Sequence, residues 1–99
     1  MKINERREGN KLIASVEGRI DTNTSPALND YFKENLEGVQ EFELDLEKVD
    51  YVSSAGLRAI LFAQKTMEAQ KGKMCVSHVC DEVMGTFELT CFTDILTII

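Results

Sequence analysis

The sequence predicts an α/β fold in which a mixed β-sheet carries helices packed mainly on one face. Apolar and acidic residues alternate from Phe42 to Glu47, a pattern typical of a strand with one buried face and one wetter face. Segments with helical periodicity separate this strand from the other predicted strands. This order favours β-α-β crossovers and therefore parallel pairing in most of the sheet.

The first predicted element is an N-terminal β-hairpin. Ile3 opens a short polar strand, and the residues from Leu12 to Val16 alternate as a second strand. The turn between them is expected around Glu8-Gly9-Asn10. We expect the first strand to be an antiparallel edge of the sheet.

Apolar residues recur at helical spacing after the segment GRIDTNTSP and predict the first helix, from about Ser25 to Leu36. Ser25 is the expected N-cap, and Pro26 suits the first helical position. Gly38 is expected to end this helix.

The second half of the chain predicts two more helices and two more strands. A second helix contains an apolar stripe and closes at Lys71-Gly72, and a short β-prone run follows. A third helix is predicted around Val83 to Phe87, and the apolar tail from Ile95 to Ile99 is expected to add a last strand. The stripe of the second helix consists of Leu57, Ile60, Leu61 and Met67, and the β-prone run covers Met74 to Val79.

Length and charge limit the class of protein. The chain has 99 residues, 43% of them hydrophobic, which fits one domain spanning residues 1–99 with a single packed core. The formal net charge of −6 argues against direct binding to nucleic acid. No window reaches the roughly 18 apolar residues of a membrane span, so we expect no membrane insertion and a cytoplasmic location.

The cysteine and histidine residues predict neither a disulfide nor a metal site. Cys75, Cys80 and Cys91 are odd in number and match neither a CxxC pair nor a zinc-ligand pattern, so we expect reduced thiols. His78 is the only histidine and forms no HExxH motif. We therefore interpret it as a structural or surface residue and expect no metal and no cofactor.

Two hydroxyl groups stand where the second helix begins, at Ser53 and Ser54. A serine is a favoured N-cap because its oxygen accepts a hydrogen bond from a free backbone N–H group, so one of the two is expected to cap the helix. The other would present its hydroxyl to solvent. A phosphate added there would meet unpaired N–H groups and the positive end of the helix dipole.

The whole chain resembles the STAS domain of bacterial anti-sigma factor antagonists. That family has a strand ending in an Asp-Leu pair, followed by a D-S-[SA]-G-L turn that opens a helix, and a G-x-[LI]-D segment before its first helix. The matching residues are Asp45-Leu46, the run from Ser53 to Leu57, and the segment GRIDTNTSP. Ser53 departs from the pattern, because the family has an Asp there.

The resemblance implies a role for four residues. Ser54 corresponds to the serine that a partner kinase phosphorylates, and Asp21 to an acidic residue near that serine that affects partner binding. Asp21 has a competing interpretation as a turn residue with Thr22 and Asn23. Ser53 supplies a second hydroxyl beside the phosphorylation site, and Gly56 would permit close approach of a partner or of a neighbouring strand.

The resemblance also implies a cost at Cys91, which stands where relatives often have a glycine that closes the third helix. If this position requires a positive φ, Cys91 costs roughly 1 kcal/mol relative to glycine.

The function implied by the resemblance is that of an anti-sigma factor antagonist without enzymatic activity of its own. Its expected partners are an anti-sigma factor serine kinase, which is a GHKL-type ATPase, and a serine phosphatase. An alternative is a STAS-type structural subunit of a signalling or transporter assembly, in which Ser54 is not phosphorylated. A third possibility, a thiol oxidoreductase using Cys75 or Cys80, lacks a CxxC motif or a Cys-His-acid set.

Overall fold

The computed structural model describes all of residues 1–99 and contains the predicted helices and strands except the C-terminal strand. No helix combines the length and apolar character that a membrane crossing requires. In chain order the elements are β1 (Lys2–Glu8), β2 (Lys11–Glu17), α1 (Ser25–Asn35), β3 (Glu41–Lys48), α2 (Ser54–Ala69), β4 (Lys73–Ser77), α3 (Asp81–Leu89) and the 3₁₀ turn η1 (Phe92–Asp94).

The four strands form one mixed sheet in the order β1-β2-β3-β4. β1 pairs antiparallel with β2 through the turn at Gly9 and Asn10, whereas the β2–β3 and β3–β4 pairs are parallel. Gly9 has a φ of +60°, a conformation that glycine adopts at little cost in a two-residue hairpin turn. The predictions of an N-terminal hairpin and an antiparallel edge strand are therefore confirmed.

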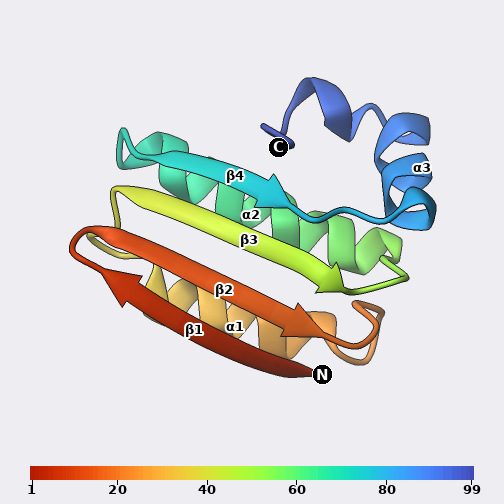
Figure 1. Cartoon of the computed structure of the whole chain (residues 1–99), viewed down its shortest axis with the longest axis horizontal. Coiled ribbons are helices and arrows are strands. Elements are labelled where there is room, and N and C mark those ends of the chain that lie inside the picture. The colour runs from red at the N-terminus through yellow and green to blue at the C-terminus, as the bar shows by residue number, and fades with distance from the viewer.

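The core lies between the sheet and the helices α1 and α2, which cover the same face (Figure 1). On β2 and β3 every second residue is fully buried against these helices, and the residues between them lie on the open face. α3 lies beyond the end of β4 rather than across the sheet (Figure 1), and it contributes Val83 and Phe87 to the core. The prediction of helices mainly on one face is confirmed.

The start of α1 differs from the prediction, because the N-cap is Thr24 rather than Ser25. Ser25 is the first residue of the helix, is 5% exposed, and donates its hydroxyl hydrogen to the backbone oxygen of Asp21. The preceding turn is closed by the Asp21 side chain, which shifts the helix boundary by one residue. Pro26 is therefore the second residue of the helix rather than the first, which is the position predicted for it.

The C-terminal tail does not form the expected strand. The chain first makes the turn η1 and then pairs with β4 at a single bridge between Ile98 and Val76. Two backbone hydrogen bonds hold this bridge, from Val76 N–H to the Thr97 oxygen and from Ile99 N–H to the Val76 oxygen. Leu96, between η1 and this bridge, is 5% exposed and belongs to the core.

Cys91 has a φ of +63° and directly follows the last turn of α3, so the conditional expectation of a positive φ at this position is met. Its N–H group donates to the Glu88 oxygen, as in helix endings that use a left-handed residue. The Cys91 side chain is exposed and its thiol, like those of Cys75 and Cys80, is free.

We expect Cys91→Gly to raise the free energy of unfolding by about 1 kcal/mol, because glycine adopts this backbone conformation without the steric cost of a Cβ atom. Urea denaturation measures the change. Cys91→Ala keeps the Cβ atom and removes the thiol, so it should show no gain. Equal gains in both variants would attribute the effect to the thiol and contradict the backbone explanation.

Candidate functional site

The candidate site is built on two loops that follow the parallel strands β2 and β3. Ile20 and Val52 form a parallel bridge between these loops. The N–H of Ile20 donates to the Tyr51 oxygen at 3.0 Å, and the N–H of Ser53 donates to the Ile20 oxygen at 2.8 Å. This pairing fixes the segment before α1 against the start of α2.

Ser53 is the N-cap of α2, as predicted for one of the two serines. Its backbone is extended, with φ −84° and ψ 175°, and its Oγ accepts a hydrogen bond from the Gly56 N–H at 3.2 Å. Ser54 is the first residue of the helix, and its side chain is exposed. The capping position is therefore already occupied, and the second hydroxyl faces solvent at a helix N-terminus.

Asp21 lies directly after Ile20 and so next to the backbone of Ser53. Its Oδ1 accepts hydrogen bonds from the N–H groups of Asn23 at 2.9 Å and Thr24 at 3.0 Å. The Thr24 N–H in particular lowers the pKa of Asp21 below its ordinary value, so the side chain is ionised at neutral pH. The turn interpretation is confirmed, although Thr24 and not Thr22 is the second turn partner.

Gly56 is buried, and its neighbours are the two paired loops. A Cβ atom at this position would lie 2.8 Å from both Cγ2 and the backbone oxygen of Ile20, and 2.9 Å from Cγ1 of Val52. The close approach expected at Gly56 is therefore an approach of the loop after β2. Gly56 is therefore expected to affect partner binding only indirectly, by allowing the two loops to pack closely.

The surface around Ser54 includes three residues that the sequence analysis did not select. The Arg19 guanidinium stacks on the exposed Tyr51 ring, 4.1 Å from its centroid, and its Nε lies 3.7 Å from Oδ2 of Asp21. Arg58 is exposed and follows Ser54 at the i+4 spacing that places two side chains on one helix face. The i+4 spacing of Ser54 and Arg58 could have been read from the sequence. The stacking of Arg19 on Tyr51 could not, because it depends on the fold.

A shallow cavity of ≈ 390 Å³ lies between residues of α1 and α2 beside this surface. It combines apolar side chains such as Phe62 with polar groups and the Arg58 side chain. Protein–protein interfaces are commonly enriched in aromatic residues and arginine and have a polar rim. The residues around Ser54 have this composition.

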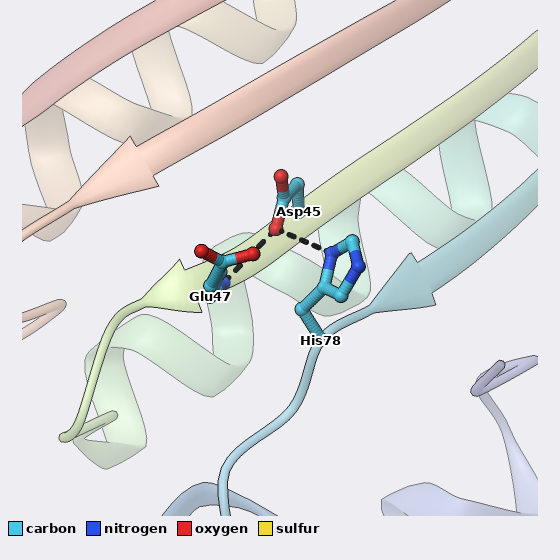
Figure 2. Close-up of side chains that lie close together, drawn as sticks. All are labelled: Asp45, Glu47 and His78. Atoms are coloured by element: carbon cyan, nitrogen blue, oxygen red, sulfur yellow. Dashed lines mark hydrogen bonds and ion pairs between the residues drawn. The ribbon is translucent and has the colours of Figure 1, made fainter.

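A second cluster lies on the open face of the sheet and contains His78. Asp45 and Glu47 project from β3, and His78 follows β4, the neighbouring parallel strand (Figure 2). The His78 Nδ1 lies 3.0 Å from Oδ1 of Asp45. The interpretation of His78 as a surface residue is confirmed, because its side chain is 57% exposed. Its acidic neighbours on β3 could not be identified from the sequence, because strand pairing brings them together. This cluster is the group of side chains that could hold a metal ion.

Known proteins resemble this chain in both sequence and fold. The model of the family described as "STAS domain" matches residues 2–99. The anti-sigma-B factor antagonist of Listeria monocytogenes is 30% identical over 97 residues, which cover 93% of this chain and 82% of that protein.

Solved structures with the same architecture include an anti-sigma factor antagonist from Mycobacterium paratuberculosis, with a TM-score of 0.87 and 19% identity over 98% of this chain and 83% of that one. The Bacillus cell fate determinant SpoIIAA in its phosphorylated form has a TM-score of 0.76 and 11% identity over 99% of this chain and 91% of that one. The unphosphorylated form of SpoIIAA gives the same TM-score of 0.76.

Proposed function

Because the chain belongs to the STAS domain family, we propose that it is an anti-sigma factor antagonist whose binding to its partner is switched off by phosphorylation of Ser54. The similarity to anti-sigma-B factor antagonists supports the general function. The exposed Ser54 hydroxyl, directly after a serine that already caps α2, is the observation that carries the switch.

In the proposed cycle the unphosphorylated protein docks on an anti-sigma factor that is a GHKL-type serine kinase, and the sigma factor is thereby released. The kinase then transfers a phosphoryl group to Ser54 and the complex dissociates. A serine phosphatase restores the hydroxyl. This chain supplies the docking surface and the acceptor hydroxyl, and the partner enzymes supply the catalysis.

The free protein has two features that would accommodate the phosphate on Ser54. The first turn of α2 presents unpaired N–H groups and the positive end of the helix dipole, both of which favour an anion. Arg58, one turn further along, forms no ion pair with another side chain of the protein and offers a guanidinium group on the same helix face. Phosphorylation is therefore expected to leave the fold intact and to act on the interface.

Asp21 supplies a negative charge to this proposed docking surface, and we expect Asp21→Asn to weaken binding to the kinase by about tenfold, with little change in stability. An asparagine oxygen can still accept the hydrogen bonds from Asn23 and Thr24, so the turn is kept while the charge is lost. A tenfold loss of affinity corresponds to about 1.4 kcal/mol of binding free energy. Titration calorimetry with the purified kinase measures the affinity, and urea denaturation measures the stability.

Asp94→Asn is a suitable control, since Asp94 is an exposed carboxylate in η1, on a different element from the Ser54 surface. It should bind the kinase as the wild type does. If Asp21→Asn also bound normally, Asp21 would be a turn residue alone and would not belong to the docking surface.

A further inference from the structure

The cluster of Asp45, Glu47 and His78 has the composition and geometry of an ion-binding site. Asp45 and Glu47 are two residues apart in β3, so both side chains leave the same face of the strand. His78 comes one residue after Ser77, which is the register partner of Asp45 on β4. The parallel register therefore brings one imidazole beside two carboxylates on the face of the sheet that no helix covers.

The donor atoms of the three side chains already lie close together. One donor atom from each residue can be chosen so that all three fall within 4.8 Å of one another, and the Asp45–His78 pair is at 3.0 Å. Two ligands of one zinc ion, each bound at about 2.0–2.2 Å, can be no more than roughly 4.4 Å apart. A small side-chain rotation is therefore enough to enclose an ion.

Asp45 is held in place by groups that would act as the outer shell of such a site. Its Oδ2 accepts a hydrogen bond from the Ser15 hydroxyl at 3.1 Å, and its Oδ1 accepts one from the Glu47 backbone N–H at 3.0 Å. A carboxylate that hydrogen bonds already hold in place needs little reorganisation to bind a cation.

The backbone of His78 is shaped to bring its ring over the carboxylates. Its φ is +55°, a left-handed conformation in which histidine is found more often than most residues. The ring extends from the end of β4 toward Asp45 (Figure 2). The His78 side chain is 57% exposed, and a cavity of ≈ 250 Å³ opens beside Asp45 and Glu47, so water can complete the coordination.

We propose that Asp45, Glu47 and His78 bind one divalent transition-metal ion, through two carboxylate oxygens and the imidazole Nδ1. Zinc suits this donor set, because it accepts imidazole nitrogen together with carboxylate oxygen and binds three protein ligands with water in the remaining position. Magnesium does not, because it prefers oxygen ligands in near-octahedral geometry and retains most of its water. The site is separate from Ser54 and does not depend on the proposed function.

The test uses zinc alone and the full chain under reducing conditions. Since His78 is the only histidine, its ring signals in NMR spectra report directly on the site. Zinc is expected to shift these signals until one equivalent has been added, and magnesium should leave them unchanged. Titration calorimetry should show zinc affinity at least about tenfold lower for Asp45→Asn, and Ser15→Ala should lower it by about 10–100-fold if the outer shell acts as inferred.

His78→Gly removes the imidazole while keeping a residue that tolerates the positive φ, and it should abolish binding at this site. Glu41→Gln is the matched control, because Glu41 is a carboxylate on the same face of β3 but outside the cluster. All variants keep the three cysteines, so thiol binding would be equal in each. Zinc that leaves the His78 ring signals unmoved, or that binds His78→Gly and Glu41→Gln with equal affinity, would overturn the proposal.

Discussion

Gly56→Ala is expected to destabilise the protein by about 1–3 kcal/mol, the usual cost of forcing an extra methyl group into a packed region. The new Cβ atom would lie 2.8 Å from the backbone oxygen of Ile20, and a backbone atom cannot rotate away as a side chain can. The bridge between Ile20 and Val52 would have to open, and with it the contact that fixes Asp21 beside Ser53. Urea denaturation of both proteins measures the loss.

Gly85→Ala provides the matched control, since Gly85 also lies within a helix but the added Cβ atom would meet no atom within 4 Å beyond its chain neighbours and its own helix backbone. Alanine is the better helix former, so this variant should be more stable than the wild type by up to about 1 kcal/mol. Opposite signs for the two variants would establish that the effect at Gly56 comes from crowding. A neutral Gly56→Ala would mean that the two loops can separate freely.

Ser54→Asp is expected to weaken binding to the anti-sigma kinase by more than about a hundredfold. Asp at the first position of α2 lies beside the positive end of the helix dipole, so the free protein should tolerate the charge. An interface formed around a neutral hydroxyl must instead desolvate that charge, and a cost of about 3 kcal/mol corresponds to a loss of this size. Titration calorimetry with the kinase measures the affinity.

Ser54→Asn separates charge from size, because asparagine has the shape of aspartate without its charge. We expect it to bind more tightly than Ser54→Asp by at least about tenfold. If both variants lost affinity equally, the surface around Ser54 would be sensitive to side-chain volume rather than to charge. Normal binding by Ser54→Asp would show that a negative charge at this position does not act as a switch.

The local features of the fold could be predicted from the sequence because each rests on neighbouring residues. The alternation from Phe42 to Glu47 identified β3 and its two faces, and helical spacing identified the three helices. The serine pair at the start of α2 predicted a cap, and Ser53 provides it. These signals depend on spacing along the chain, which strongly constrains strands, helices and their ends.

The features that could not be predicted depend on contacts between distant residues. His78 meets Asp45 only because β3 and β4 pair in one register, and no local pattern specifies that register. The N-cap of α1 is a different case, because it depends on a local hydrogen bond from the Thr24 N–H to the Asp21 side chain that the prediction overlooked. The apolar tail predicted a strand, but Leu96 enters the core and only Ile98 forms a bridge with β4. At His78 and at Leu96, contacts between distant residues decided the structure.

The most direct test of the proposed switch is to locate phosphate after incubation with the partner kinase and ATP. Mass spectrometry of the wild type, Ser53→Ala and Ser54→Ala would assign the modified residue. We expect one phosphate on Ser54 in the wild type and in Ser53→Ala, which loses a cap worth about 1 kcal/mol but remains folded. Ser54→Ala should take up none and should still bind the kinase. Loss of phosphate in Ser53→Ala alone would assign the switch to the other hydroxyl, and a wild type without phosphate would contradict the switch altogether.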